Sequence, residues 1–202
     1  LSTTKDVQDK ILTDAKYAKA ISVIDIQLWW YQANGELYAP QGGQHLAPRQ
    51  HVRLLRPKNS SFTQVLRAVR EYRTHYPDKA VTYSADTKFG WAVLLGGGSL
   101  PSLPQNTDKE LLKAIAGMNL YDLPGNPNGQ YALAKQGEQY LIYADLDRKL
   151  SIDLTDVKGQ FAVIRVDMET GKSIPLGQSI QGSKQQEFEL PSVPCLIWLS
   201  QK

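Results

Sequence analysis

The sequence predicts an α/β segment followed by an all-β segment. The first observation behind this fold class is an alternation of helix-like and strand-like stretches over residues 1–124, which is typical of βαβ units. The second is a series of short alternating apolar stretches after residue 125, separated by turn residues, which is typical of a small antiparallel β-sandwich. We therefore expect two domains, residues 1–124 and 125–202.

The first segment begins with a predicted helix and a predicted buried strand. Residues 5–19 carry apolar side chains at helical spacing, after Thr4 as a candidate cap. Residues 21–28 form an apolar run rich in β-branched side chains, which predicts a strand of a parallel sheet. Residues 32–58 are a long polar connection with several Gly and Pro turn signals.

The rest of the first segment continues the alternation. Residues 62–76 place their apolar side chains on one helical face, after Ser60 or Ser61 as a cap and before Pro77 as a stop. A short strand is expected over 80–84. Two further helices are expected, over 89–95 and 108–118, and the three glycines between them permit close backbone packing or a sharp turn.

The second segment follows a turn-rich stretch at residues 123–129. Alternation is clearest in Leu150–Leu154 and Phe161–Val166. The expected strands are Tyr131–Lys135, Gln139–Ala144, Leu150–Leu154, Phe161–Asp167, Gln186–Leu190 and Cys195–Leu199.

The end of the first predicted strand is the strongest candidate for a site. This strand holds a carboxylate, Asp25, and leads directly into Trp29, Trp30 and Tyr31. Aromatic rings stack on sugar faces, and a carboxylate binds hydroxyls or performs acid–base chemistry. The alternative is that the two tryptophans cap the core and Asp25 is a paired structural acid.

Composition excludes several classes of function. The net charge of +3 and the sparse basic residues do not form a nucleic-acid surface, and no apolar run approaches the roughly 20 residues of a membrane span. The acid-free stretch from Arg49 to Lys58 faces either an anionic ligand or only solvent. Three histidines without metal-site spacing and a single cysteine, Cys195, predict neither a metal site nor a cofactor.

A family resemblance rests on four stretches of the sequence. These are Trp91-Ala-Val-Leu-Leu-Gly-Gly-Gly98, Tyr140-Leu-Ile-Tyr143, the run from Gly159 to Gly171, and Pro194-Cys-Leu-Ile-Trp-Leu199. With them the chain resembles the C-terminal part of bacterial, apiosidase-like glycoside-hydrolase proteins. In those proteins a (β/α)8 barrel is followed by a small β-sandwich catalogued as a collagen-binding domain.

The resemblance implies that residues 1–124 are the last strands and helices of a TIM-like barrel. Such a barrel takes about 250 residues, so it implies a longer parent protein, with the remainder of the parent barrel as a partner. It also implies a secreted protein, extracellular or periplasmic, that acts on plant or host polysaccharide.

The resemblance also implies a site, with one departure. Related enzymes usually end one of the last strands in a nucleophilic Glu, whereas the corresponding strand here ends in Tyr83-Ser84, with Asp86 nearby. The candidate catalytic carboxylates are therefore Asp25 and Glu36. The candidate substrate-binding residues are Trp29, Trp30, Tyr31, Tyr83, Ser84, Asp86 and Arg49.

Two functions remain open from the sequence. In the first, the chain is the C-terminal part of a glycoside hydrolase, inactive as 202 residues alone, with the sandwich as an accessory. In the second, the chain is a non-catalytic carbohydrate-binding or structural module that uses the same aromatic rings only for stacking.

Overall fold

The computed structural model of the chain describes residues 1–38, 59–85, 88–125 and 127–202. The described residues form two compact units, Leu1–Ser102 and Leu103–Lys202. The division between the units lies ahead of the boundary expected at 124/125. The residues between these two positions carry a helix and a strand that belong to the second unit.

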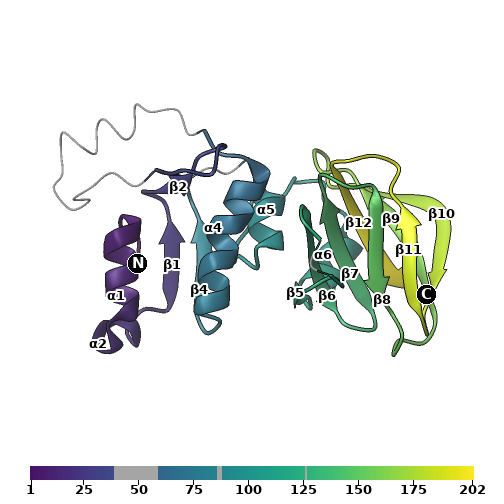
Figure 1. The fold of residues 1–202 in the computed structure, drawn as a ribbon, viewed down its shortest axis with the longest axis horizontal. Helices are drawn as coiled ribbons and strands as arrows, with labels where there is room; N and C mark the ends of the chain where they lie inside the picture. The colour runs from purple at the N-terminus through teal and green to yellow at the C-terminus, as the bar shows by residue number, and fades with distance from the viewer. Residues whose placement is uncertain (39–58, 86–87, 126) are drawn as a thin grey trace. The chain divides into compact units, whose positions relative to one another are not determined.

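The first unit combines short helices with short strands (Figure 1). Its elements are α1 (Lys5–Thr13), α2 (Ala15–Ala18), β1 (Val23–Ile26), β2 (Trp30–Tyr31), β3 (Leu37–Tyr38), α4 (Phe62–His75), β4 (Ala80–Tyr83) and α5 (Gly90–Leu95).

Helix α4 begins and ends where the sequence predicts. The hydroxyl of Ser61 accepts a hydrogen bond from the backbone N–H of Gln64, which satisfies one of the free donors of the first turn. Pro77 follows the last turn and prevents continuation. The buried face of the helix consists of Val65, Leu66, Ala68, Val69 and Tyr72.

Strands β1 and β4 form a parallel pair that positions the candidate site. Ile24 lies opposite Val81, and Ile26 lies opposite Tyr83. All four side chains are buried. Asp25 and its partner Thr82 occupy the alternating positions and are only half-buried. Because side chains alternate along a strand, the pair has one apolar face and one polar face.

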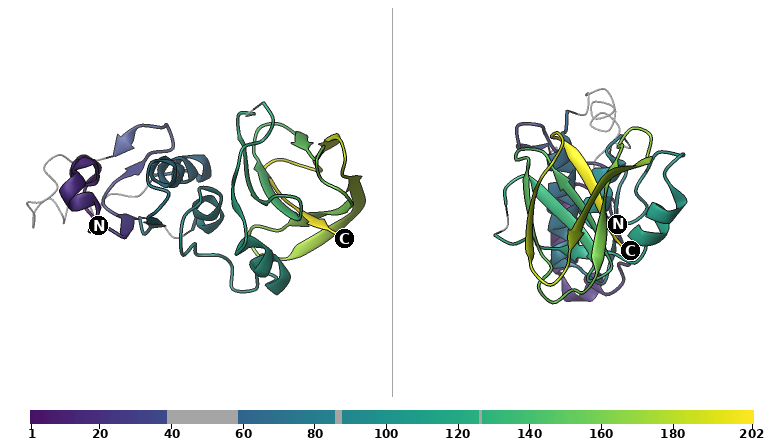
Figure 2. Two further views of the ribbon diagram at one scale, coloured as in Figure 1. Left: turned by 90° about the horizontal axis from the view of Figure 1, so that it is seen from below. Right: turned by 90° about the vertical axis from the view of Figure 1, so that its right-hand side faces the viewer.

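The second unit is a β structure with one short helix (Figure 2). Its elements are α6 (Lys109–Ile115), β5 (Asn119–Tyr121), β6 (Gln130–Lys135), β7 (Gln139–Ala144), β8 (Lys149–Asp153), β9 (Gln160–Val166), β10 (Ser173–Gln181), β11 (Gln185–Glu189) and β12 (Cys195–Gln201).

The strands of the second unit share a single core. Six of them form an antiparallel sheet in the order β10-β9-β12-β7-β6-β5, and β11 pairs with β8. The core draws on both sheets, with Tyr140 and Phe161 from the larger one and Leu150 and Ile152 from β8. Strand β10 is one of the two edge strands of the larger sheet, and its register with β9 shifts between Pro175 and Ser179.

The expected fold class is wrong. The described chain is mostly β, with 34% of residues in strands and 22% in helices, and its sheets are not closed. Parallel pairing among the described residues is confined to β1 and β4, so they do not form the end of a TIM-like barrel. The βαβ pattern predicts which two strands pair, whereas closure requires every strand to pair on both sides.

Gly96 allows α4 and α5 to approach closely. A Cβ atom at this position would lie 2.9 Å from Val69 Cβ and 3.0 Å from the carbonyl oxygen of Leu66. Both distances are shorter than ordinary van der Waals contact. The glycine run expected to permit close packing therefore does so at this residue.

We predict that Gly96→Ala lowers the free energy of unfolding by about 1–3 kcal/mol, because the added methyl overpacks the contact with α4. Gly117→Ala is the control, since its Cβ would meet nothing closer than 3.5 Å. Hydrogen exchange measured separately on α4 and α6 checks both variants. Equal protection of α4 in Gly96→Ala and the parent chain would contradict the steric argument.

Candidate functional site

Asp25 lies on the polar face of the parallel pair. Its neighbours Ile24 and Ile26 are fully buried on the opposite face. Asp25 Oδ1 accepts hydrogen bonds from Thr82 Oγ1 at 2.8 Å and from Ser84 Oγ at 2.7 Å. Two hydroxyl donors from the neighbouring strand therefore fix the direction of this carboxylate.

The main chain of Asp25 is held as well. Its N–H donates to the carbonyl oxygen of Leu1 at 2.8 Å, and its own carbonyl accepts from Gln8 Nε2 at 3.0 Å. Asp25 Oδ2 forms no hydrogen bond with any residue that the structure describes. Oδ2 is therefore the atom of Asp25 that is available to a ligand.

Trp29 lies in the core, with no exposed surface. Its Nε1–H donates to Gln8 Oε1 at 2.8 Å. Its ring makes edge contacts with Tyr31 and Tyr72 at centroid distances of 5.7 and 5.6 Å. Because protein surrounds the ring, it has no free face on which a sugar could stack.

Tyr31 is joined to a network of charged groups. Its hydroxyl donates to Glu71 Oε2 at 2.6 Å, and the guanidinium of Arg67 lies 4.0 Å from the ring centre. Lys5 Nζ contacts Glu71 Oε1 at 2.7 Å and Asp9 Oδ2 at 2.9 Å. The network thereby ties α1, β2 and α4 together.

Burial and the network shift the protonation of several groups. Burial, followed by the hydrogen bond to Glu71, raises the pKa of Tyr31 to about 12. Burial and the hydrogen bond to Asp9 raise the pKa of Tyr72 further. Burial alone would lower the pKa of Lys5, but its hydrogen bonds to Asp9 and Glu71 outweigh burial and raise it. At neutral pH both tyrosines are therefore neutral and Lys5 is charged.

Trp30 and Tyr38 form a ring pair across the β2–β3 hairpin. Their centroids lie 4.2 Å apart, and Trp30 is only 4% exposed. Because Tyr31 contacts α4, the alternation along β2 directs Trp30 to the other side of the hairpin. The Nε1–H of Trp30 is buried without a hydrogen-bond partner in the described structure.

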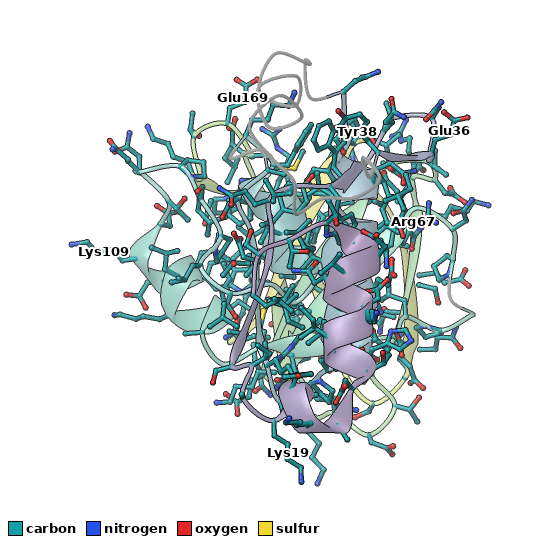
Figure 3. All side chains as sticks on the ribbon, turned by 90° about the vertical axis from the view of Figure 1, so that its left-hand side faces the viewer. Lys19, Glu36, Tyr38, Arg67, Lys109 and Glu169 are labelled. Atoms are coloured by element: carbon teal, nitrogen blue, oxygen red, sulfur yellow. The ribbon has the colours of Figure 1, made fainter. Side chains whose placement is uncertain are left out.

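The remaining predicted site residues have different environments. Tyr83 is buried, and Ser84 and Glu36 are exposed. In Figure 3, Glu36 lies near Tyr38 at the upper edge of the view. The Glu36 carboxylate forms no hydrogen bond or ion pair within residues 1–38, 59–85, 88–125 and 127–202. Arg49 and Asp86 lie outside the described residues.

Sequence reasoning missed several residues of this region, among them Lys5, Gln8, Glu71 and Thr82. A signal was available for Gln8, because it lies one helical turn before the buried Leu12 and is itself fully buried. A polar residue on the buried face of a helix indicates a specific hydrogen-bond partner.

A hollow of about 520 Å³ lies near the start of β1, between Ser22 and Lys79. Lys79 Nζ donates to the carbonyl oxygens of Ala18 and Ile21, each at 3.0 Å. The ammonium group of Lys79 thereby satisfies two backbone acceptors after α2.

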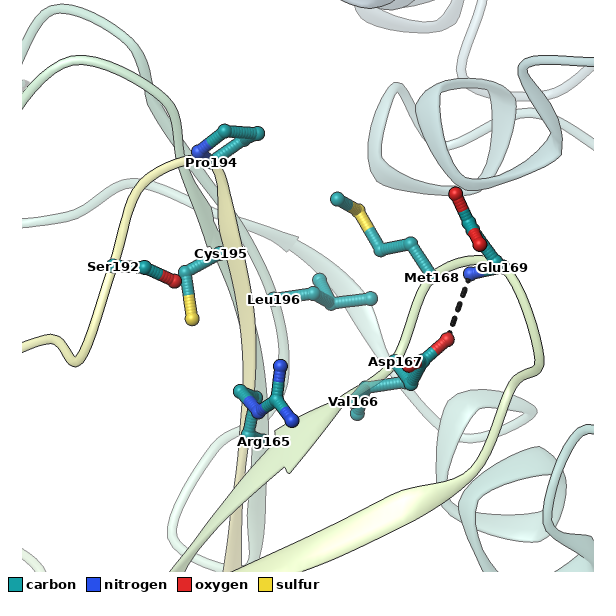
Figure 4. A pocket seen from close by; sticks show the side chains of 9 residues that line it. All are labelled: Arg165, Val166, Asp167, Met168, Glu169, Ser192, Pro194, Cys195 and Leu196. Atoms are coloured by element: carbon teal, nitrogen blue, oxygen red, sulfur yellow. Dashed lines mark hydrogen bonds between the residues drawn. The ribbon is translucent and has the colours of Figure 1, made fainter.

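The second unit has a hollow of about 150 Å³ near the end of β9 and the start of β12. Figure 4 shows Ser192, Arg165 and Cys195 among its lining residues. The carboxylate of Asp167 is engaged in its own turn, where it accepts from the backbone N–H of Glu169 at 3.1 Å. Burial raises the pKa of the Cys195 thiol, so this cysteine is a poor nucleophile at neutral pH.

Two further classes of feature are absent from the described residues. His, Cys, Asp and Glu side chains do not gather there in groups of three or more that would suit a metal ion. No helix within these residues has the length and apolar character that crossing a bilayer requires.

Comparison with known families identifies the first part of the chain. A family described as "Domain of unknown function (DUF6298)" matches residues 1–118, more than half of the sequence. The chain belongs to the DUF6298 family. No curated protein matches this DUF6298 chain.

Solved structures show what the fold of the DUF6298 chain is similar to. One is described as "Glycoside hydrolase", with a TM-score of 0.54 and 11% identity, and the match covers 94% of this chain and 55% of the other. Another is a glycoside hydrolase family 5 protein from Bacteroides vulgatus ATCC 8482. It has a TM-score of 0.54 and 12% identity, with 95% and 53% of the two chains covered. The DUF6298 chain thus spans about half the length of these glycoside hydrolases and shares their fold over that part.

We predict that Tyr31→Phe makes the first unit less sensitive to alkaline pH. The raised pKa of Tyr31 means that the folded state favours its neutral hydroxyl. This contribution to stability is present in full at pH values below the unfolded pKa near 10. That contribution is lost as pH rises through about 12. The slope of unfolding free energy against pH between 10 and 12 should therefore be shallower in the variant.

Denaturant titrations at several pH values provide the measurement. Tyr17→Phe is the matched control, because Tyr17 is 52% exposed and its removal should leave the slope unchanged. If the two variants gave identical slopes, the Tyr31 hydroxyl would not be the source of the alkaline sensitivity.

Proposed function

We propose that this chain is part of a glycoside hydrolase and that the polar face of β1 and β4 binds its polysaccharide substrate. The fold shared with glycoside hydrolases over almost the whole chain supports this proposal. Carbohydrate sites combine oriented carboxylates and hydroxyls with aromatic surfaces. Asp25 supplies the carboxylate, and Thr82 and Ser84 supply the hydroxyls.

The orientation of Asp25 is the observation that carries the proposal. Thr82 and Ser84 both bind Oδ1, which leaves Oδ2 available to accept a hydrogen bond from a sugar hydroxyl. A carboxylate held in one rotamer binds with little further loss of side-chain entropy. The same atom can receive or return a proton during cleavage of a glycosidic bond.

The charge of the site favours a neutral sugar. A uronic acid next to Asp25 would place two carboxylates together, which is unfavourable. The cations Lys5 and Arg67 contact Trp29 and Tyr31, and Lys5 is already paired with two acids. We therefore propose a neutral hexose or pentose polymer of plant or host origin.

Hydrolysis requires a second carboxyl group, about 5–9.5 Å from the first. We propose Glu36 for this role, since its carboxylate has no partner among the described residues and is exposed to solvent. We also propose that the chain acts within a longer secreted protein, outside the cytoplasm. The greater length of its glycoside-hydrolase neighbours supports the longer protein, and the secreted location remains a proposal from the family resemblance.

We predict that Asp25→Asn in the natural full-length protein lowers turnover of its polysaccharide by about 10²–10⁴-fold, as loss of a catalytic acid or base does. The substitution is isosteric, and the amide oxygen can still accept from Thr82 and Ser84. Stability should therefore change little. Reducing-sugar release from a panel of neutral polysaccharides measures turnover, and affinity gel electrophoresis measures binding.

Asp156→Asn, an exposed aspartate of the second unit, is the control and should retain full turnover. Binding by the parent protein without any hydrolysis, lost in Asp25→Asn, would support the non-catalytic alternative. Equal binding and equal turnover in the parent and Asp25→Asn would remove Asp25 from the site.

A further inference from the structure

We infer that Gln8 is the positioning residue of the Asp25 site. This inference rests on the proposed function of Asp25. Gln8 lies on α1 with no exposed surface, seventeen residues before the strand position that it contacts. It does not touch the carboxylate, so it would act through the main chain of Asp25.

All the hydrogen-bonding groups of the Gln8 amide are engaged. Nε2 has two N–H donors, which are directed at the carbonyl oxygen of Leu1 at 2.9 Å and that of Asp25 at 3.0 Å. Oε1 accepts from Trp29 Nε1 at 2.8 Å. Because both carbonyls can only accept and the indole can only donate, a single orientation of the amide satisfies every partner.

This arrangement connects Asp25 to the buried core of the unit. Trp29 is fully buried between Tyr31 and Tyr72, so the amide that binds its indole cannot shift freely. The same amide fixes the peptide plane between Asp25 and Ile26. The orientation of this peptide plane sets where the Asp25 carboxylate meets Thr82 and Ser84. A displacement of about 1 Å at a reacting group can lower the rate of catalysis about 10²-fold.

Packing alone does not explain a glutamine at this position. Leu12, one turn further along the same face of α1, is an ordinary buried apolar residue. A buried amide is unfavourable unless its hydrogen bonds are all made. Gln8 instead donates to the main chain of Asp25, the one β1 residue with a carboxylate.

The test compares two substitutions of Gln8. Gln8→Glu keeps the shape, but an ionised carboxylate has no donor for the two carbonyls. Burial raises the pKa of the introduced carboxyl, and its protonated form regains one donor and the acceptor for Trp29. The stability of Gln8→Glu should therefore fall as pH rises from about 4 through the raised pKa. Gln8→Met removes the hydrogen bonds at every pH.

Two NMR signals report the geometry directly. The Trp29 indole N–H reports its bond to residue 8, and the Ile26 amide nitrogen shares a peptide with the Asp25 carbonyl. Both signals should move in Gln8→Met at every pH. In Gln8→Glu they should move at pH 7 and return most of the way at pH 5.

The second measurement is the ligand affinity of the full-length protein. The probes are a soluble glucan, a galactomannan and an arabinoxylan, and the probe that the parent protein binds is used for the variants. Affinity should fall about tenfold or more in Gln8→Met at both pH values. In Gln8→Glu it should fall at pH 7 and recover at pH 5, relative to the parent at the same pH.

Leu12→Val is the matched control, because it loosens the same helix face without touching Asp25. It should lower stability and leave the Ile26 signal and the affinity unchanged. An equal loss of affinity in Leu12→Val, or unchanged affinity in Gln8→Met, would overturn the positioning role. If the parent protein bound none of the probes, the proposed function would fail, and unmoved Ile26 and Trp29 signals would still separately refute the link from Gln8 to Asp25.

Discussion

The two faces of the β1–β4 pair impose the constraint on which the first unit depends. A parallel pair with four residues in each strand has only four side chains on each face. Its stability therefore depends on what covers the apolar side. Ile24, Ile26 and Val81 are fully buried there, so helices must pack against them. The opposite face is left for polar side chains, and this is where Asp25 lies.

A partly buried cation joins the helices that provide this cover. Lys5 is bound by Asp9 and Glu71 and lies over the rings of Trp29 and Tyr72. Withdrawing an ammonium group from water is unfavourable, and paired carboxylates with aromatic faces offset that penalty. The hydroxyls of Tyr31 and Tyr72 donate hydrogen bonds to the carboxylates of Glu71 and Asp9. Helices α1 and α4 are thereby joined through directional contacts between residues more than sixty positions apart. Such contacts specify one arrangement better than apolar packing alone.

Local patterns predicted local structure well and long-range structure poorly. Caps and periodicity placed α4, and alternation placed β8 and β9, because these signals act within a few residues. Strand β10 was not predicted, because most of its side chains are exposed and its sequence therefore shows no regular spacing of apolar residues. The βαβ pattern led to a barrel because it carries no information about closure. Asp25 could be selected from the sequence, but its partners Gln8 and Thr82 lie 17 and 57 residues away, where spacing gives no guide.

The irregular strand β10 has a consequence for the behaviour of many copies together. An exposed sheet edge offers free N–H and C=O groups to any extended chain, and a long regular edge invites stacking into fibrils. Two features of β10 interrupt that row of groups. One is the break in register after Pro175, and the other is the proline itself, which lacks an N–H. Crowded or newly synthesised copies therefore meet an edge on which a foreign strand cannot continue its pairing, and the sheet is protected from aggregation along β10.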